Sequence, residues 1–416
     1  MVVARDTEEP LRCACGTYDE FSSVPNNCLK GIKWSPDGTC LLTASEDHNL
    51  RIFELPTELS GEKSTELTSA VCTREGDAVY DYAWYPALDS SEPATCCFLS
   101  ASRDHPMHLW DAYTGGCRAS YVAHNHLDEV IGAHSCAFEP TGQRIFCGFD
   151  RTVRIFDASR PGRKCELRPT CSSKRARDGQ RGIISCFAFA PDYSGLYAAG
   201  SYSGTTGLYT EGSPGLIVQL GEHTGGVTQV SFSYDGKLLY TAARCDPAIR
   251  CWDVRMTCRV LASFERSCPT NQRVGFELIG GLSDGLITAS HDGRILVYET
   301  ASPQKPPTTL LTFDDATNAA TIHPHLPLLG VAVGERRFPL DAAAGQHTAG
   351  AAAAEGEGSA PSETESESEE EREGRNGLSV WLLPPSVAAG KAGAEEAREG
   401  GAAEELPDAG ADEATE

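Results

Sequence analysis

The sequence contains no run of about 18 consecutive apolar residues, the length that a helix needs to span a bilayer. It has no basic and then apolar start of the kind that directs secretion. No glycine-rich loop is followed by Lys-Ser or Lys-Thr for phosphate binding, and no His-Glu-x-x-His stands ready for zinc. We therefore expect neither a membrane protein nor an enzyme, and no cofactor.

Cysteine is plentiful, with 17 residues, but it lacks the spacing of a metal site. The tight clusters are Cys13-x-Cys15 and Cys96-Cys97, and neither has a second Cys or His pair at zinc spacing. Many of the others, such as Cys136, stand in segments expected to be strands. This pattern predicts that the cysteines act as small buried hydrophobic side chains in a reducing compartment and bind no metal.

The net charge of −24 is distributed unevenly. From Asp341 onward the chain has 19 acidic and 4 basic residues, a net charge of −15, which leaves −9 for the first 340 residues. A moderately acidic body of this kind can carry a locally basic face, so the acidic composition does not exclude a nucleic-acid partner.

One spacing recurs along the chain. A small polar residue, usually Asp, stands six positions before an aromatic residue that is usually followed by an acid. The six copies are Asp47 with Phe53, Asp104 with Trp110, Asp150 with Phe156, Ser203 with Tyr209, Asp246 with Trp252 and Asp292 with Tyr298. We interpret each copy as a hairpin in which the polar residue caps the turn and the aromatic packs between units. This repeat predicts an all-β WD-repeat β-propeller.

The repeats predict seven blades within residues 18–383. Residues 18–24 are expected to supply the outer strand that closes the ring, and an outer strand of blade one is expected near residues 67–72. Blade seven is split by an acidic insertion at 338–376. That insertion and the tail at 384–416 are nearly free of aromatics and should be disordered, as should a short flexible arm at 1–17.

Within the insertion, Ser and Thr alternate with Glu, a context that an acid-directed kinase would accept. Candidate modification sites are Ser362, Ser366 and Ser368, although a solvated spacer explains the same composition. The expected turn residues are Asp47, Asp104, Asp150, Asp246 and Asp292. Turn capping also explains the pairs Asp104-His105 and His291-Asp292 without acid–base catalysis.

In a propeller, the hairpins between second and third strands and the links between blades meet on one face. Candidate RNA-binding residues at these positions are Lys30, Arg103, His105, Asn125, His126, Arg151, Arg244, Asn271, Arg273 and Arg336, with Tyr80 and Tyr202 among them. Arginine contacts phosphate and stacks on bases, whereas Asn and His read base edges, so the ring suits unpaired RNA. Propellers that bind acidic peptides also carry basic links, so a protein partner stays open.

Three motifs outside the repeat core are more specific: Asn-His-Leu-Asp-Glu at 125–129, Arg-Pro-Gly-Arg at 160–163 and Thr-Asn-Gln-Arg at 270–273. With the stretch at 102–112 and the split last blade, they closely resemble the telomerase Cajal body protein family, which are nuclear WD-repeat proteins. The resemblance covers about residues 27–338 and 378–383.

The resemblance implies a scaffold that binds a short loop motif in H/ACA-type small Cajal-body RNAs, and in telomerase RNA where that RNA carries the motif. It implies transport of these particles to Cajal bodies and help with telomerase assembly. The implied partners are H/ACA ribonucleoprotein components, telomerase and a cytosolic chaperonin for folding. We expect a monomer in the nucleus and Cajal body, with some in the cytoplasm.

Family members carry a long N-terminal region, whereas about 17 residues precede the expected propeller here, so targeting by such a region is not implied. A rival interpretation is a substrate receptor of a cullin–RING ubiquitin ligase, or another protein-interaction scaffold. It rests on the box Trp252-Asp253-Val254-Arg255, which would offer Arg255 on the opposite face of the ring.

Overall fold

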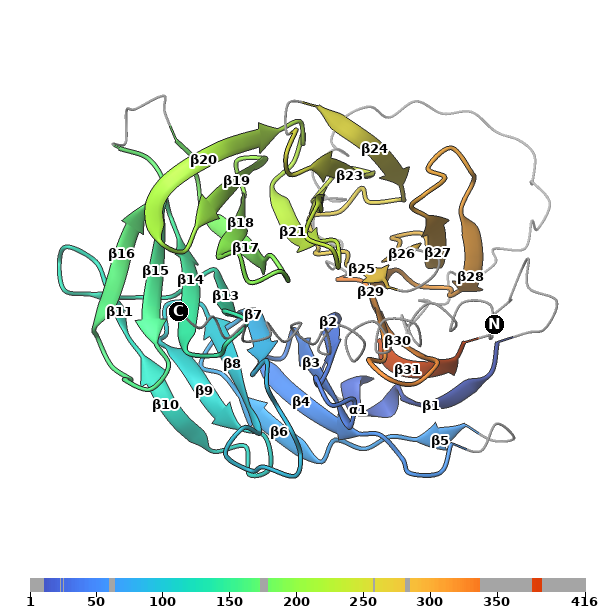
Figure 1. The fold of residues 1–416 in the computed structure, drawn as a ribbon. Coiled ribbons are helices and arrows are strands. Elements are labelled where there is room, and N and C mark those ends of the chain that lie inside the picture. Colours follow the sequence, from blue (N-terminus) through green and yellow to red (C-terminus); the bar gives the residue numbers. More distant parts are fainter. Residues whose placement is uncertain are drawn as a thin grey trace, which may run out of the picture.

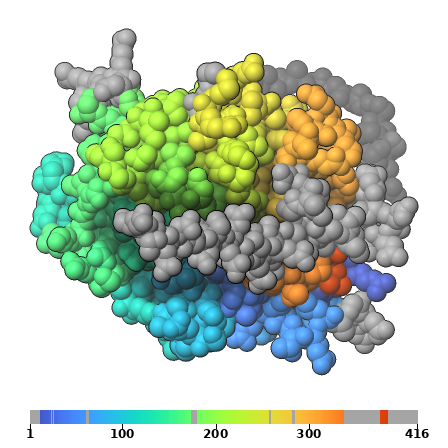
Figure 2. Space-filling view, in the orientation of Figure 1, coloured from blue at the N-terminus to red at the C-terminus, as the bar shows by residue number. Residues whose placement is uncertain are grey.

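The computed structural model describes residues 11–22, 24, 26–59, 64–172, 179–256, 259–280, 285–336 and 376–383. Seven small sheets are arranged as blades of a β-propeller, which confirms the predicted fold class (Figure 1). The blades follow one another around the ring in chain order, as the colours in Figure 2 show. Within the described residues, no helix is both long enough and apolar enough to cross a membrane.

Blades one to six are four-stranded sheets in which neighbouring strands run antiparallel. Blades one to three consist of β2 (Leu29–Trp34), β3 (Cys40–Ser45), β4 (Asn49–Glu54) and β6 (Val71–Arg74); β7 (Val79–Trp84), β8 (Cys97–Ser102), β9 (Met107–Asp111) and β10 (Cys117–Tyr121); and β13 (Ser135–Phe138), β14 (Arg144–Phe149), β15 (Thr152–Asp157) and β16 (Cys165–Pro169). A two-stranded ribbon, β11 (Ala123–His124) with β12 (Val130–Ile131), lies between blades two and three.

The next three blades repeat the same order of strands. They consist of β17 (Ile184–Phe189), β18 (Leu196–Ser201), β19 (Thr205–Thr210) and β20 (Ser213–Gly221); β21 (Val227–Phe232), β22 (Leu238–Ala243), β23 (Ala248–Asp253) and β24 (Val260–Glu265); and β25 (Phe276–Ile279), β26 (Gly285–Ala289), β27 (Arg294–Glu299) and β28 (Thr308–Thr312). In each blade the strand nearest the ring axis comes first in the chain (Figure 1).

Blade seven joins the two ends of the described chain. It contains β29 (Thr317–Ile322), β30 (Leu328–Val333) and β31 (Gly377–Leu382), so the blade is split as predicted. The insertion at 338–376 lies outside the described residues except for Asn376, and the tail at 384–416 lies wholly outside them. The candidate modification sites Ser362, Ser366 and Ser368 also fall outside.

An N-terminal strand closes the ring, as predicted, but the residues predicted for it were wrong. The closing strand is β1 (Cys13–Thr17), which pairs antiparallel with β31, and not residues 18–24. Part of the expected strand instead forms the short helix α1 (Asp19–Ser22), whose Phe21 is buried. The last residues of the predicted flexible arm are therefore part of a sheet.

The outer strand of blade one also differs from the prediction. It is β6, which begins at Val71 rather than near residue 67. The preceding β5 (Thr65–Glu66) pairs parallel with β1 and adds a fifth strand to blade seven. The link between β4 and β6 of blade one thus covers the outer edge of the closing strand, which protects that edge from pairing with other chains.

Five of the six aromatic residues of the repeats lie in the core, and Trp110 is partly buried. Phe53, Phe156, Tyr209 and Trp252 are each at most 2% exposed. Neighbouring blades are also joined by indole hydrogen bonds to backbone carbonyls; the Nε1 of Trp34 donates across the junction of blades one and seven to the carbonyl of Thr321 at 3.2 Å. Burial of these large rings between blades is the main apolar contribution to ring stability.

The predicted turn residues take three roles. Asp47, Asp246 and Asp292 each accept a hydrogen bond from the backbone N–H two residues later, at 3.1, 3.0 and 3.4 Å. Asp104 occupies the turn with a positive φ of 54°, a conformation that Asp tolerates better than most residues. The carboxylate of Asp150 is instead engaged by the guanidinium of Arg151.

Blade five contains a buried polar network built on one of these turns. His223 Nδ1 lies 2.9 Å from the Asp246 carboxylate and its Nε2 lies 2.8 Å from Thr241 Oγ1, which also accepts from Trp252 Nε1 at 2.9 Å. Arg250 Nη1 donates to the same carboxylate at 2.7 Å. His223, which stands in a link between blades, is therefore a buried structural residue.

This network predicts a loss of stability at acidic pH. Burial lowers the pKa of His223, so the unfolded chain takes up a proton below about pH 6.5 that the folded chain does not. Although burial opposes its charge, hydrogen bonds from Arg250 lower the pKa of Asp246 to about 2, which contributes about 2 kcal/mol that is lost between about pH 4 and pH 2.

We expect the free energy of unfolding, measured in urea at a series of pH values, to fall in these two steps. The half-buried His134 has a pKa lowered by burial as well, so His223→Gln should make the step below about pH 6.5 smaller, whereas the matched variant of the exposed His126, His126→Gln, should keep it in full. A step of unchanged size in His223→Gln would assign it to other groups.

Candidate nucleic-acid interface

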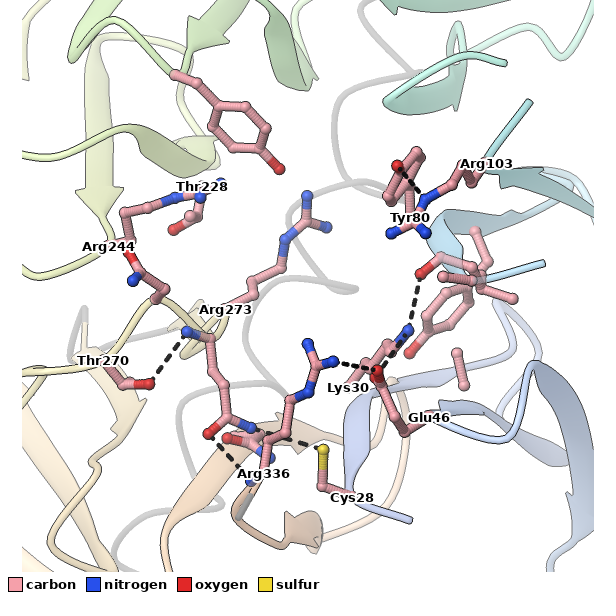
Figure 3. Close-up of a pocket in the computed structure, with 18 of the residues that line it drawn as sticks. Cys28, Lys30, Glu46, Tyr80, Arg103, Thr228, Arg244, Thr270, Arg273 and Arg336 are labelled. Atoms are coloured by element: carbon pink, nitrogen blue, oxygen red, sulfur yellow. Dashed lines mark hydrogen bonds and ion pairs between the residues drawn. The ribbon is translucent and has the colours of Figure 1, made fainter. Parts of the chain in front are cut away.

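A cavity of about 670 Å³ opens where the inner ends of the blades meet, and residues from blades one, two, four, five, six and seven line it (Figure 3). Its charged lining within the described residues consists of five cations and one carboxylate, namely Lys30, Arg103, Arg244, Arg273, Arg336 and Glu46. Asn271, Tyr80 and Tyr202 also line it. Six of the ten predicted RNA-binding residues are thus brought together, in a chain whose net charge is −24.

Two arginines of the cavity are held by tyrosines, Arg244 on the face of a ring and Arg103 at a ring hydroxyl. The guanidinium carbon of Arg244, from the turn after β22, lies 3.9 Å from the centroid of the Tyr202 ring. Arg103, from the turn after β8, donates from Nε to the hydroxyl of Tyr80 at 3.1 Å and is 53% exposed. Each ring holds its guanidinium in place, which leaves a planar cationic surface for a further stacking group.

The Tyr80 ring is itself supported from behind. It stacks on His134 with ring centroids 5.0 Å apart and an interplanar angle of 25°. Burial lowers the pKa of His134, so a neutral imidazole backs the ring. His134 thus supports the Tyr80 ring, and the Tyr80 hydroxyl in turn positions the Arg103 guanidinium.

The sequence predicted Arg273 as an RNA-contacting residue on the surface. In the structure, however, its guanidinium is bound by other parts of the protein. Its Nη1 lies 3.2 Å from Asp81 Oδ1 on β7, and its Nη2 donates to the carbonyl of Ser185 on β17 at 3.0 Å. Although burial opposes its charge, Asp81 raises the pKa of Arg273. Arg273 therefore connects three blades across the floor of the cavity.

The wall formed by blades one and seven holds Glu46, the single carboxylate of the described lining. Lys30 Nζ lies 3.1 Å from Glu46 Oε2, and Arg336 Nη2 lies 3.4 Å from Glu46 Oε1 (Figure 3). The side chain of Gln272 is fixed nearby, since its Oε1 accepts from the backbone N–H of Arg336 at 3.4 Å. The wall thus presents a carboxylate between two cations.

Four predicted residues lie outside the cavity lining. His105 Nδ1 contacts the carbonyl of Arg103 at 2.6 Å, and Arg151 is paired with the neighbouring Asp150. The Asn125 side chain closes its own loop, accepting from the N–H groups of Leu127 and Glu129 at 2.8 and 3.0 Å. His126 is exposed on the same loop, beside β11 at the outer rim of the ring (Figure 1).

The two family-specific motifs at 125–129 and 160–163 contact each other at this rim. Arg163 is paired with Asp128, and its Nε donates to His124 Nδ1 at 3.2 Å. The backbone N–H of Gly162 donates to the carbonyl of Ser120 at 2.9 Å. Both motifs therefore build one rim structure between blades two and three, away from the cavity.

Among the cavity residues that sequence reasoning missed are Glu46, Gln272 and Tyr82. Glu46 directly precedes the turn residue Asp47, and Gln272 lies inside the motif at 270–273. The sequence could therefore have placed both residues on the partner-binding face. Tyr82 is buried on β7, and its hydroxyl makes no hydrogen bond within the described part of the chain. Nothing in the local sequence distinguishes it from a core tyrosine.

Known proteins resemble this chain at two levels. The family model "WD domain, G-beta repeat" matches residues 18–54, 115–157 and 215–253. Telomerase Cajal body protein 1 of Rattus norvegicus is 45% identical over 336 residues, which is 78% of this chain and 62% of that protein. The Homo sapiens protein of the same name is 44% identical over 80% of this chain and 62% of its own length.

The chain belongs to the telomerase Cajal body protein family. A Drosophila melanogaster protein with the name "Telomerase Cajal body protein 1 homolog" is 32% identical over 78% of this chain and 60% of that protein. The chain spans about three-fifths of the length of these telomerase Cajal body proteins. No group of three or more potential metal ligands occurs in the described residues of this family member.

Proposed function

We propose that this chain is an RNA-binding scaffold that recognises an unpaired loop motif in small Cajal-body RNAs of the H/ACA type. The observation that carries the proposal is a cavity with five cations and one carboxylate in an acidic chain. A cavity of this charge attracts phosphate, and its Arg–Tyr stacks offer surfaces for unstacked bases. The names of the relatives support a role in the Cajal body and with telomerase.

The scaffold holds H/ACA ribonucleoprotein particles and directs them to Cajal bodies, with telomerase among its partners. It acts without catalysis, as a monomer, in the nucleus and with a cytoplasmic fraction that a chaperonin folds. Closure of its ring depends on pairing between distant residues, which makes unassisted folding slow.

The direct test is to crosslink the protein in cells and sequence the attached RNA. Enrichment of H/ACA-type RNAs with a shared loop motif supports the proposal. A yield of RNA at background would contradict it.

The binding face makes a separate prediction. Arg103→Ala and Arg244→Ala should each weaken binding of the crosslinked RNA about 10-fold, because a stacked base contributes roughly 1–3 kcal/mol. The slope of log K against log salt should fall by about 0.7 for each phosphate that the variant no longer binds. Electrophoretic or fluorescence titration at several salt concentrations measures both, and the thermal midpoint should stay near that of the unmodified protein.

Arg255→Ala is the matched control. Arg255 follows β23 at the end remote from Arg244, is 70% exposed and pairs with Asp253 at 3.1 Å, so the variant loses the same charge elsewhere. Equal weakening by Arg255→Ala would show a general charge effect rather than a site. Loss of a cullin adaptor in this variant, with RNA binding absent throughout, would favour the ubiquitin-ligase receptor instead.

A further inference from the structure

Glu46 is the unexpected member of the cavity. The other charged residues of the described lining are cations suited to phosphate, and a carboxylate among them repels the same ligand. Its side chain is 24% exposed, so it faces the cavity and is not sealed in the core. A group that opposes phosphate binding at this position requires a reason.

A purely structural role explains Glu46 poorly. Its ion pairs join blade one, through Lys30, to Arg336 after β30 of blade seven. Both are partly exposed, with Arg336 at 48%, and pairs of this kind contribute little to stability. Lys30 also has a second partner, the carbonyl of Val79 at 3.3 Å. The ring is closed independently by the pairing of β1 with β31.

The arrangement matches one edge of a nucleobase. A cation beside a carboxylate presents hydrogen-bond donors next to two acceptor oxygens. The Watson–Crick edge of guanine presents the complement, its O6 acceptor next to the N1–H and N2–H donors. Adenine, cytosine and uracil each place an acceptor where one of these donors stands, and that acceptor would face the carboxylate. Unpaired loop bases are commonly read on this edge.

We propose that Glu46 selects a guanine in the unpaired RNA loop, with Lys30 or Arg336 donating to O6. This inference rests on the proposed function, since it names the base that the same site reads. The cavity volume of about 670 Å³ lies within the range of about 300–1,000 Å³ that suits a small-ligand pocket, so it accommodates single unstacked nucleotides. Arg244 lies across the cavity from Glu46, and Arg103 lies on the same side as Glu46, so neighbouring bases and phosphates can be held from both directions (Figure 3).

The test uses a library of RNA hairpins with a randomised loop, selected on the full chain and on Glu46→Gln. The unmodified protein should enrich loops with one invariant guanine, and Glu46→Gln should lose the preference at that position. In the enriched hairpin, replacing this guanine by inosine removes the N2–H donors and should weaken binding about 10-fold. Glu46→Gln should bind the guanine and inosine hairpins within about two-fold of each other.

Glu335→Gln is the control, because Glu335 pairs with His291 at 3.2 Å beside the cavity and loses the same charge without lining it. It should keep the guanine preference. The inosine comparison on unmodified protein does not depend on any variant folding. Enrichment without an invariant guanine, or an unchanged preference in Glu46→Gln, would overturn this inference while RNA binding stands. No enrichment by the unmodified protein would overturn the proposed function itself.

Discussion

Arg273→Ala is expected to lower the free energy of unfolding by about 2 kcal/mol, less than the cost of breaking a fully buried ion pair, because the Arg273 side chain is 30% exposed. The variant removes the guanidinium that joins Asp81 on β7 to the carbonyl of Ser185 on β17. Asp81, which is 8% exposed as a side chain, would keep Lys33 Nζ at 3.7 Å and the backbone N–H of Cys136 at 3.2 Å. These remaining partners keep the cost from being larger.

Urea unfolding followed by circular dichroism measures the effect. Arg103→Ala is the matched control, since it removes a guanidinium from the same cavity but one that is 53% exposed, and it should change stability by less than about 1 kcal/mol. Arg273→Lys should recover part of the loss through its charge. If Arg273→Ala unfolds at the same urea concentration as the unmodified protein, Arg273 belongs with the RNA-contacting residues and not with the structural ones.

The repeat spacing was sufficient to predict the ring because it depends on local chemistry. A turn residue, a short strand and an aromatic lie within a few positions of one another, as Asp246 and Trp252 do. Each blade can therefore be identified from its own short segment of sequence. The face on which the hairpins meet then follows from topology. This is why six of the ten candidate residues line one cavity.

The errors concern pairs of residues that are distant in the sequence. Arg273 has the pattern of a surface residue until Asp81, 192 positions away, is brought beside it. His223 and Asn125 likewise lie in links between blades. At such positions the sequence pattern does not distinguish a side chain that binds a partner molecule from one that forms hydrogen bonds within the protein. Polar residues at such positions are assigned by tertiary structure rather than by spacing.

The closing strand was misplaced for a related reason. Residues 18–24 contain Tyr18, Phe21 and Val24, which suit a strand, whereas β1 reads Cys-Ala-Cys-Gly-Thr and has no large apolar residue. β1 lies between β31 and β5, and at Gly16 an added Cβ would lie 2.7 Å from the carbonyl oxygen of Leu378, so this position has no room for a side chain. Ala14 and Cys15 are at most 1% exposed there. Strand propensity indicated the wrong segment because packing space, not propensity, decided the choice.

Removal of residues 1–17 therefore distinguishes a flexible arm from a closing strand. A flexible arm could be deleted without effect, whereas loss of the five-residue β1 should cost on the order of 5 kcal/mol at about 1 kcal/mol for each backbone hydrogen bond. It would also expose the edge of β31, and we expect aggregation measurable by light scattering. Deletion of residues 1–10 alone is the control and should leave unfolding unchanged.

A single substitution tests the same point without shortening the chain. A Cβ added at Gly16 would lie 2.7 Å from the carbonyl oxygen of Leu378, a backbone atom that cannot move without separating β1 from β31. Gly16→Ala should therefore lower the free energy of unfolding by about 1–3 kcal/mol. Gly212→Ala is the matched control, because a Cβ there would meet no atom within 4 Å. Equal stability of the two variants would mean that β1 does not hold the ring closed; a loss confined to Gly16→Ala would locate the closure in this strand.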